Sequence, residues 1–439
     1  MAARNHFLGK RIAVIGLGPH GEMVADVRFL IKSGALVSIY DLRSEARLKD
    51  HVVFLREIGL ANYVCGSIPP EDLAEMDLII LSHEYPRDSS FLKDIDPAKI
   101  PIEYPETLFF RLAPPVTVVG VMGSCGKSTV VSMLAPMLEE TCESLEDQGF
   151  FVLDPESDDG IIAQLKKLKS GDIVLLRVAE RMMKELHTMR ISPHVAVFTT
   201  QPSQGSYEES PFEILEFQTY NNFIVGSDEI IDSVKSRPAE ARAKMLRTKA
   251  GLVPADWVFQ GKGIHDRDNA ALALQAARLF KVTDEVAQDV LASWKPLKGH
   301  LELVKKVKGI EFYNDSAAVS STATEAGIRS LGLEKNLVLV FGGSDSGYDY
   351  RALYSFMPEH VHTLVLLPGS GTMRERQTIE RINHVQVISA PSLEEAARLA
   401  LENAKKGDRV LFSPGFEAGG FDRSRKERGE RFVKAVRAL

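Results

Sequence analysis

The stretch that most constrains this chain is residues 116–129, VTVVGVMGSCGKST, because it joins three local patterns in a fixed order. A β-branched apolar run ends in a glycine-rich turn, and the segment VVSMLAPML that follows has a helical pattern. A turn in this position aims several backbone N–H groups at a phosphate beside the N-terminus of the helix. The sequence therefore predicts a strand, a phosphate-binding turn and a helix, and with them a site for a nucleoside triphosphate.

The residue types in the turn suit this role. The glycines let the backbone approach a phosphate closely, Lys127 reaches toward the outer phosphates, and the Ser128 hydroxyl can hold Mg²⁺. The strict P-loop spacing needs glycine at position 121, which is Val121 here, so the turn is a shortened variant. We expect the whole turn to contact the nucleotide, through Gly123, Ser124, Cys125, Gly126, Lys127, Ser128 and Thr129.

Composition narrows the class of protein. The chain has 439 residues, of which 44% are hydrophobic and 26% charged, and this predicts two or three ordinary globular domains. Its net charge of −7 gives no basic footprint, so we expect no nucleic-acid partner. The three cysteines lie in no metal-binding spacing, and their scarcity indicates a reducing cytoplasm.

The hydrophobic pattern predicts no membrane insertion. The apolar run after the basic N-terminal residues stops at a glycine within a few residues, unlike a signal peptide. No apolar stretch approaches the roughly 20 residues that span a bilayer. We expect a cytoplasmic protein.

Strand and helix patterns alternate along the chain, which predicts an α/β fold built from parallel βαβ units. Residues 101–115 contain four prolines and predict a linker, since the residue before a proline disfavours helix. We predict three domains. They are a Rossmann-like domain at 1–112, a central P-loop domain at 113–295 and a second Rossmann-like domain at 296–439.

A second glycine-rich motif lies near the N-terminus. Gly16, Gly18 and Gly21 follow a strand pattern and precede a helix pattern, and Asp41 comes about 20 residues later, after the next strand. Three interpretations stay open: an NAD(P) site, a site for another nucleotide diphosphate, or a structural turn. Arg43 is either a contact for an anionic group or a solvated surface charge.

Polar residues at predicted strand ends and helix starts give further candidates. His265 and Asn269 lie one turn apart on a predicted helix, where they would either contact adenine or ribose or cap the helix in solvent. Asp315 and Ser413 follow strands, where α/β folds bind ligands, although each motif also suits a plain turn. The basic segment 422–432 is either a solvated helix face or a phosphate contact.

Taken together and in this order, the motifs resemble those of the Mur ligases, ATP-dependent amide ligases that build the peptide of peptidoglycan. The resemblance covers essentially the whole chain. The matching segments are the opening GLGxxG, the P-loop GSCGKST, the pair His265 and Asn269, Lys298-Gly299-His300, the strand end NDS, the turn GGxD, and Ser413-Pro414 with Arg428-Gly429. Weak motifs in the correct order and spacing are more specific than any one of them.

The resemblance implies UDP-N-acetylmuramoyl-L-alanine in the first domain, ATP with Mg²⁺ in the second and an amino acid, D-glutamate, in the third, in a monomer. It also implies that a substrate carboxylate attacks the γ-phosphate and that an amine then attacks the acyl phosphate. The residues implied are Lys127 and His300 for catalysis, the P-loop with His265, Asn269 and Asp315 for ATP, Gly16, Gly18, Gly21, Asp41, Arg43 and Ser413 for substrate, and Ser128 and Glu180 for metal.

The chain departs from the family where metal chemistry is implied. The family strand VxLExSSFQ supplies a glutamate for Mg²⁺, but here Leu176 or Arg177 falls at that place, depending on register. Glu180 is a substitute only if the strand bends. The loop that follows in the family contains a histidine, and residues 199–204 contain none. The family's carbamylated lysine has no counterpart near residues 217–221.

The third domain departs in the same way. The lysine of the DSKATN motif is absent from residues 315–320, and Ser346 replaces the lysine after GGxD. Ala418 stands for a family serine and Leu301 for a basic residue. Arg423 and Arg425 are the nearest replacement charges.

Three interpretations follow. The chain is a divergent ligase, with Arg177 as a fixed cation in place of a metal ion; or a degenerate relative that binds ATP or UDP-sugar without ligating; or a Rossmann oxidoreductase beside an NTPase. The third fits least, because the ordered motifs extend through the last domain. The intact pair Lys127 and Ser128, together with His265 and Asn269, favours retained use of ATP.

Overall fold

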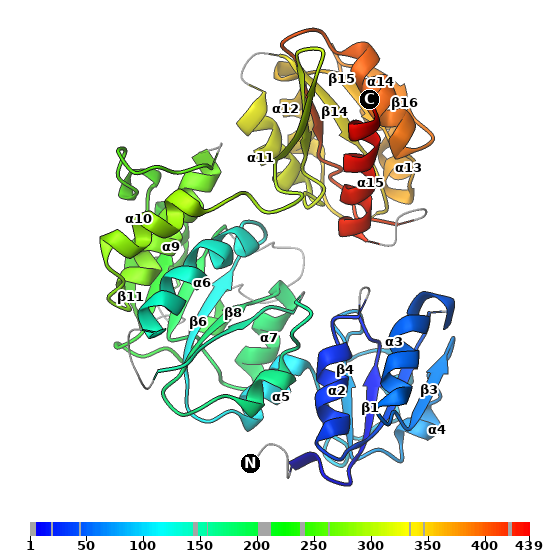
Figure 1. The fold of residues 1–439 in the computed structure, drawn as a ribbon, viewed down its shortest axis with the longest axis vertical. Coiled ribbons are helices and arrows are strands. Elements are labelled where there is room, and N and C mark those ends of the chain that lie inside the picture. Colours follow the sequence, from blue (N-terminus) through cyan, green and yellow to red (C-terminus); the bar gives the residue numbers. More distant parts are fainter. Residues whose placement is uncertain are drawn as a thin grey trace. The chain divides into compact units, whose positions relative to one another are not determined.

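The structure is a computed structural model. It describes residues 6–18, 21–43, 45–143, 148–155, 157–200, 212–237, 242–261, 264–332, 335–345, 347–419 and 424–439. The chain divides into two compact units, one of Met1–Leu252 with Ala271–Ala287 and the other of Val253–Ala270 with Gln288–Leu439. Three mainly parallel sheets carry the fold (Figure 1), so the predicted α/β class with three sheet-based domains is confirmed.

The first sheet lies in unit one and has the strand order β3-β2-β1-β4-β5, with all neighbours parallel. Its strands are β1 (Arg11–Ile15), β2 (Leu36–Asp41), β3 (Asn62–Cys65), β4 (Leu78–Leu81) and β5 (Ile102–Glu103). Its helices are α2 (Val24–Lys32), α3 (Glu45–Glu57), α4 (Pro70–Leu73), η1 (Ser90–Leu92) and α5 (Pro105–Leu112). The order reverses next to β1, the place where open α/β sheets bind ligands.

The prediction that residues 101–115 form a linker was wrong. Ile102–Glu103 forms β5 and Pro105–Leu112 forms α5. Pro105 is the first residue of the helix, where a missing N–H costs nothing and the fixed φ suits the turn. Tyr104 before it is extended, and its N–H donates to Oγ1 of Thr107 at 2.8 Å. The proline therefore marks the start of a helix.

The second sheet also lies in unit one, with the order β11-β10-β9-β6-β8-β7. Its strands are β6 (Thr117–Met122), β7 (Phe150–Leu153), β8 (Ile173–Arg177), β9 (Val195–Phe198), β10 (Phe223–Gly226) and β11 (Lys244–Arg247). Its helices are α6 (Lys127–Glu143), η2 (Ile162–Lys166), α7 (Glu180–Thr188), η4 (Glu213–Leu215), α8 (Asp228–Lys235) and η5 (Ala250–Leu252). Strand β6 lies between β9 and β8, so the carboxyl ends of all three meet at one edge.

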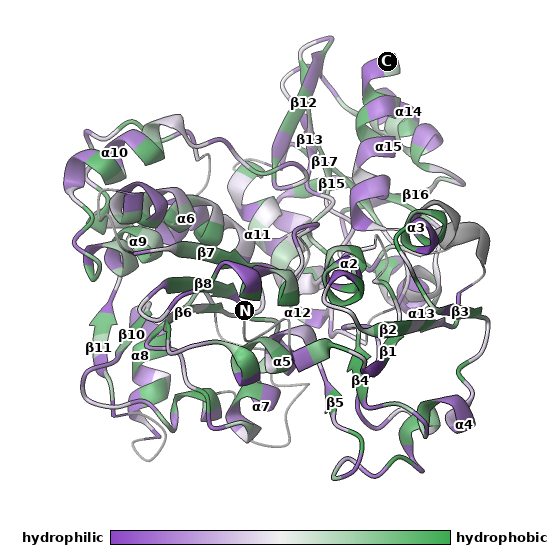
Figure 2. Ribbon diagram, turned by 60° about the horizontal axis from the view of Figure 1, so that its bottom comes forward, coloured by the Kyte–Doolittle hydropathy of each residue, from purple (hydrophilic) through white to green (hydrophobic). Residues whose placement is uncertain are grey.

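Burial follows the expected two-sided pattern in this unit. Figure 2 shows strands such as β6 as hydrophobic and helices such as α7 as hydrophilic on one side and hydrophobic on the other. In α7 the buried side chains are Met182, Met183 and Leu186, which recur at helical spacing. One hydrophobic cluster joins residues of the first and second sheets, so the sequence builds them on a shared core.

The third sheet lies in unit two, with the order β12-β13-β17-β14-β15-β16. Its strands are β12 (Glu302–Val307), β13 (Ile310–Asn314), β14 (Leu337–Phe341), β15 (Val361–Leu366), β16 (Gln386–Ser389) and β17 (Arg409–Phe412). Its helices are α11 (Ser321–Leu331), α12 (Arg351–Phe356), η6 (Met357–Glu359), α13 (Ser370–Ile379), α14 (Leu393–Asn403) and α15 (Arg425–Ala438). Helices α9 (Ile264–Arg278) and α10 (Asp284–Ser293) cross the division between units.

The central strand of this sheet is buried on both faces. In β14, Leu339 and Phe341 pack into one hydrophobic cluster, whereas Val338 and Val340 pack into another. A parallel strand covered on both sides reads as a continuous apolar run. The edge strand β12 differs: it runs antiparallel to β13, and its register shifts between Leu303 and Lys305.

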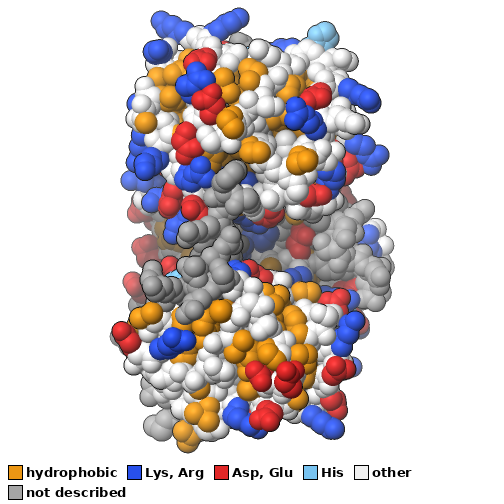
Figure 3. Space-filling view, turned by 90° about the vertical axis from the view of Figure 1, so that its right-hand side faces the viewer, with side chains coloured by type: hydrophobic (Ala, Val, Ile, Leu, Met, Phe, Trp, Pro, Cys, Tyr) orange, Lys and Arg blue, Asp and Glu red, His pale blue; other side chains and the backbone are white. Residues whose placement is uncertain are grey.

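The surface mixes charges of both signs. Figure 3 shows lysine and arginine side chains interspersed with aspartate and glutamate on the face that it draws. Within the described ranges, no helix has both the length and the apolar character needed to cross a membrane.

Candidate active site

The P-loop lies at the carboxyl end of β6, where the strand passes into α6. Gly123 has a φ of +130° and Gly126 a φ of +83°, a region that favours glycine. A Cβ atom on Gly123 would lie 2.4 Å from Oγ1 of Thr199 and 2.8 Å from the backbone nitrogen of Thr200. Helix α6 begins at Lys127. The predicted order of strand, glycine turn and helix is therefore present in the structure.

The amides of the turn face a hydroxyl group. The N–H groups of Ser124 and Cys125 donate to Oγ1 of Thr200, at 3.0 and 3.2 Å. Nζ of Lys127 donates to the carbonyl oxygens of Gly123 and Ser124. An anion that enters the turn would form charge-assisted hydrogen bonds, which are roughly twice as strong as bonds to a neutral oxygen. Thr200 thus occupies a place suited to a phosphate oxygen.

Sequence reasoning missed Thr200. Residues 199–204 were noted only for lacking a histidine, and residues 201–204 lie outside the described part of the chain. The position of Thr200 in the sequence is the signal that could have revealed it. Thr199 and Thr200 directly follow β9, which pairs with the P-loop strand β6, so their side chains come to the same edge of the sheet.

Arg177 lies in β8, the strand in which the resemblance implies a metal-binding acid. It is the last residue of β8 and pairs in register with Val121 of the P-loop strand. Its side chain is 8% exposed, and its Nε lies 2.6 Å from Oδ1 of Asp154. A buried guanidinium with a carboxylate partner therefore lies at the carboxyl end of this strand.

Glu180 begins α7, after the chain turns at the end of β8. It lies close enough to Cys125 that, together with burial, which has the larger effect, it raises the pKa of that thiol. The predicted metal residues Ser128 and Glu180 thus both belong to the P-loop region. Ser128 fits the role of a hydroxyl ligand to a nucleotide-bound Mg²⁺.

The described residues do not fit a second, protein-held cation. Among the residues that the structure describes, no group of three or more His, Cys, Asp and Glu side chains is placed to hold a metal ion. Arg177 adds a fixed positive charge in the same region.

The N-terminal glycine turn is organised by an ion pair. Gly16, Gly18 and Gly21 have φ values of +78°, +80° and +86°. Asp41 ends β2 and is fully buried, and Arg43 donates to it from Nε at 2.8 Å and from Nη2 at 2.6 Å. Burial opposes the ionisation of Asp41, but the hydrogen bonds from Arg43 outweigh it and lower its pKa. Pro19 and His20 of the motif lie outside the described residues.

Arg43 covers the turn. Its Nη1 donates to the carbonyl oxygen of Gly18 at 2.9 Å, and its Nη2 lies 3.5 Å from Glu84. Asp41 uses both oxygens on Arg43 and also accepts from the backbone N–H of Leu17 at 3.3 Å. The predicted substrate residues Gly16, Gly18, Asp41 and Arg43 therefore lie together, and Asp41 positions the cation.

An aromatic and charged cluster also lies in unit one, and sequence reasoning did not detect it. The guanidinium groups of Arg87 and Arg181 lie 5.2 and 5.6 Å from the ring centre of Tyr104. His83 stacks on the same ring, and its Nε2 lies 2.8 Å from Oε1 of Glu106. Glu106 is fully buried, and burial raises its pKa to about 8.

The remaining predicted residues belong to unit two, whereas both glycine turns belong to unit one. Asp315 follows β13 and is buried, and it accepts a hydrogen bond from Oγ of Ser413 at 2.8 Å and one from the N–H of Leu301 at 3.3 Å. Burial raises the pKa of Asp315 to about 7. The structure thus joins Asp315, a predicted ATP contact, to Ser413, a predicted substrate contact.

The two predicted histidines of unit two lie near the start of a helix and of a strand. His265 is in the first turn of α9, with its Nδ1 2.9 Å from Oγ of Ser330, and Asn269 is buried in the same helix. His300 lies in the turn before β12, with its Nδ1 3.2 Å from the carbonyl oxygen of Lys298.

Charges near the predicted amino-acid site pair with one another. Asp345 of the GGxD turn pairs with Arg374, and Arg425 pairs with Glu417. Ser346 and Arg423 lie outside the described residues. Arg425 is therefore already matched by an internal carboxylate.

The comparisons with known proteins agree with this geometry. A family model, Mur ligase, glutamate ligase domain, matches residues 299–416. The chain is 28% identical over 462 residues to UDP-N-acetylmuramoylalanine--D-glutamate ligase of Geotalea daltonii, covering 98% of each chain. It is 27% identical to the protein of that name in a Thermoanaerobacter species, covering 98% of this chain and 99% of the relative.

Solved structures share the fold. UDP-N-acetylmuramate-alanine ligase MurC from Thermotoga maritima has a TM-score of 0.62 at 14% identity, with 98% of this chain and 99% of that chain covered. MurF ligase from the same organism, solved in complex with ADP, has a TM-score of 0.58 at 17% identity, with 92% and 94% covered. The predicted resemblance is therefore confirmed: over nearly its whole length, this chain is similar to Mur ligases.

Proposed function

We propose that this chain is an ATP-dependent ligase of peptidoglycan precursor synthesis that joins an amino acid to UDP-N-acetylmuramoyl-L-alanine. The P-loop turn, with Lys127 at the start of α6, is the observation that carries the proposal. The chain also aligns over 98% of its length with UDP-N-acetylmuramoylalanine--D-glutamate ligase of Geotalea daltonii. The N-terminal glycine turn, covered by Arg43, suits the diphosphate of a UDP-linked substrate.

The reaction has two steps. The substrate carboxylate oxygen attacks the γ-phosphorus of ATP, the bond to the ADP oxygen breaks, and an acyl phosphate forms. The amine of the incoming amino acid then attacks the acyl carbon, inorganic phosphate leaves, and the nitrogen loses a proton to give the amide.

The first step brings two anions together, and this is where the cations of the chain act. Two like charges about 4 Å apart repel by roughly 4 kcal/mol at an effective dielectric constant of 20. At about 1.4 kcal/mol per factor of ten, this repulsion slows the reaction nearly a thousandfold. Lys127 at the turn offsets part of this repulsion, and Arg177 is a second cation at the same edge of the sheet.

Magnesium would bind with the nucleotide, and Ser128 would hold it. When bound, the ion neutralises phosphate charge during transfer. Because the residues for a second, protein-held ion do not fit, we expect one Mg²⁺ per ATP complex. A metal-bound structure, or a titration by calorimetry, tests this number, and two protein-liganded ions would contradict it.

The relatives named above add D-glutamate, and we propose the same substrate for this chain. The experiment is phosphate release from ATP with UDP-N-acetylmuramoyl-L-alanine across D- and L-amino acids, with Lys127→Ala as the inactive control. Release that depends on one amino acid supports a working ligase and identifies its substrate. Binding of ATP or the UDP-sugar without release under any combination would favour the alternative, a degenerate relative in a regulatory or assembly role.

A further inference from the structure

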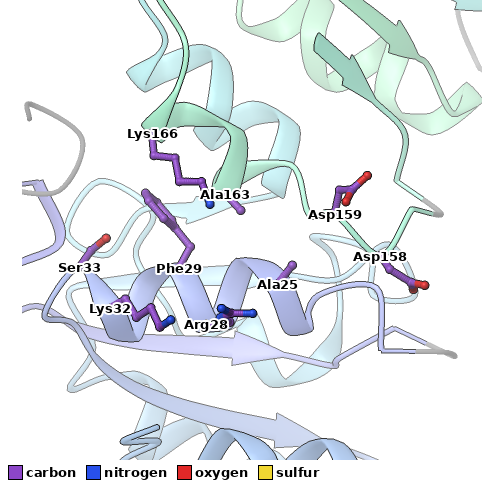
Figure 4. Close-up of a pocket in the computed structure, with 9 residues that line it drawn as sticks. All are labelled: Ala25, Arg28, Phe29, Lys32, Ser33, Asp158, Asp159, Ala163 and Lys166. Atoms are coloured by element: carbon purple, nitrogen blue, oxygen red, sulfur yellow. The ribbon is translucent and has the colours of Figure 1, made fainter. Parts of the chain in front are cut away.

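A pocket of about 290 Å³ lies in unit one, lined by one face of α2 and by the segment around η2 (Figure 4). From α2 come Arg28, Phe29 and Lys32, followed by Ser33 just after the helix. These positions recur at helical spacing, so they share one side of the helix. Lys166 comes from η2 on the opposite wall. None of these residues belongs to the glycine turns or to any motif that the proposed ligase uses.

The pocket collects positive charge. Arg28, Lys32 and Lys166 line it, and within the described part of the chain none of the three forms an ion pair. Two acidic residues, Asp158 and Asp159, lie at the other end, and Figure 4 shows their carboxylates turned away from the three cations. Oδ2 of Asp159 accepts a hydrogen bond from Oγ of Ser157 at 3.1 Å. Among the described residues, the three cations therefore have no paired carboxylate.

Ser33 supplies a second, independent observation. Its side chain is 6% exposed, and its Oγ has no hydrogen-bond partner among the described residues, although it lines the pocket. A buried hydroxyl without a partner costs about 1–3 kcal/mol, so native structures usually satisfy such groups. A ligand oxygen in the pocket would satisfy this one.

The two walls of the pocket are fixed to each other. Asp26 of α2 accepts hydrogen bonds from the N–H groups of Ile161 and Ala163, at 3.1 and 2.9 Å. Gly160 packs so closely on the same helix that a Cβ atom there would lie 2.5 Å from Oδ1 of Asp26. The two backbone segments that carry the cations are thus fixed to each other without a ligand, so that binding does not have to bring them together.

We propose that this pocket binds a small anion that carries a phosphate group, with the phosphate between Arg28, Lys32 and Lys166 and an oxygen on Ser33. The volume lies at the lower limit of ligand pockets, which begin near about 300 Å³, so it suits a small metabolite. Apolar contact comes from Phe29 and Ala163. The site is distinct from the ATP and UDP-substrate sites, and the proposal does not depend on ligase activity.

The test uses the full chain with Lys127→Ala, so that the P-loop does not itself bind phosphate. Calorimetric titrations with glycerol phosphate and inorganic phosphate should both show binding at millimolar concentration, and glycerol should show none. Binding of glycerol phosphate alone would assign the site to an organic phosphate, whereas equal binding of both would assign it to phosphate itself.

Two substitutions of equal charge change distinguish the pocket from general attraction. Lys166→Glu should weaken binding by about tenfold or more, since it replaces a charge-assisted bond by repulsion. Lys167→Glu, next in sequence but outside the pocket lining, should leave it within about twofold, because an exposed side chain that makes no contact with the bound phosphate acts only through solvent and salt. Ser33→Ala should weaken binding by about threefold, and thermal unfolding checks that each variant folds. Equal weakening by the two glutamate variants, or no binding of either phosphate, would overturn the proposal.

Discussion

The two glycine turns of unit one start from similar sequence patterns and present different chemistry to a ligand. At the P-loop, the amides of Ser124 and Cys125 contact the hydroxyl of Thr200, a neutral group that an anion can displace. At the N-terminal turn, Asp41 is locked to Arg43 in a buried ion pair. An anion at the P-loop can therefore replace the hydrogen bonds to Thr200. At the N-terminal turn the ion pair would stay in place, and a ligand would contact the outer side of Arg43.

The difference shows what a glycine motif does and does not specify. Glycine fixes the backbone of both turns through positive φ values and close approach. The side chain that contacts each turn comes from another segment, Thr200 after β9 in one case and Arg43 after β2 in the other. Substitutions in each of the two turns test this difference.

The largest effect is expected at the P-loop. Lys127→Ala should weaken ATP binding by about a thousandfold, because the turn loses the only side-chain cation that the motif assigns to the phosphates. Equilibrium binding of a fluorescent ATP analogue measures this loss. Lys167→Ala, an exposed lysine outside the site, is the control and should bind as the parent does. Unchanged affinity in Lys127→Ala would overturn the P-loop assignment.

A substitution in the N-terminal turn should change the stability of the protein. Arg43→Ala leaves Asp41 buried without its partner, and this should lower the free energy of unfolding by about 3 kcal/mol at neutral pH. Chemical denaturation measures the change. Because Arg43 holds the pKa of Asp41 below its unfolded value, its stabilisation is present above that value and disappears as the pH falls. The deficit of the variant should therefore shrink in acid.

The exposed pair of Asp349 and Arg351 provides the matched control. Their atoms are 2.6 Å apart, as in the buried pair, but both side chains are largely in solvent. Arg351→Ala should leave the unfolding free energy unchanged within error, since exposed pairs are screened. A loss as large as that of Arg43→Ala would show that burial does not set the difference.

The contribution of the buried Glu106 carboxyl to stability should depend on pH in the opposite direction to that of Asp41. Its folded pKa of about 8 lies above the unfolded value, so the folded state keeps its proton and loses relative stability as the pH rises through this interval. Glu106→Gln removes the titration. The variant should gain roughly 4 kcal/mol over the parent between about pH 5 and pH 8, because the slope is about 1.4 kcal/mol per pH unit across this interval. A constant difference across this range would contradict a protonated Glu106.

The smallest effect is expected at Thr200. Thr200→Val keeps the shape and removes the hydroxyl, so the unliganded turn should lose about 1 kcal/mol of stability. ATP affinity should rise by about threefold, because the phosphate no longer displaces a hydrogen bond. Thr188→Val, at an exposed helix position, should change neither quantity. A fall in ATP affinity would instead make Thr200 a ligand of the nucleotide.

Much of the fold was readable from the sequence because parallel strands buried on both faces are long apolar runs. The strands around Val340 and Leu411 are runs of this kind. Short or partly exposed strands, among them β3, β7 and β12, lack this signal because their burial is incomplete. The prolines of residues 101–115 were taken as breaks, although Pro105 starts a helix.

The site was predictable where the backbone carries the chemistry and less so where side chains do. The glycine positions and Lys127 follow from local spacing. The pairing of Arg177 with Asp154 and the seating of Thr200 on the P-loop depend on strand order, which joins residues distant in sequence. Asp315 and Ser413 were singled out separately, and only the adjacency of β13 and β17 brings them together.

The antiparallel strand β12 at the edge of the third sheet has a consequence for the chain at high concentration. An open edge offers unpaired N–H and C=O groups to any other extended chain, and charges or bulges along it discourage such pairing. Here Lys305 and Lys306 follow the register shift, and Nζ of Lys305 donates to the carbonyl oxygen of Arg437 at 3.2 Å. A second copy that docked a strand there would have to bury both charges. We therefore expect the charges on this strand edge to disfavour fibrous aggregation of the protein at high concentration.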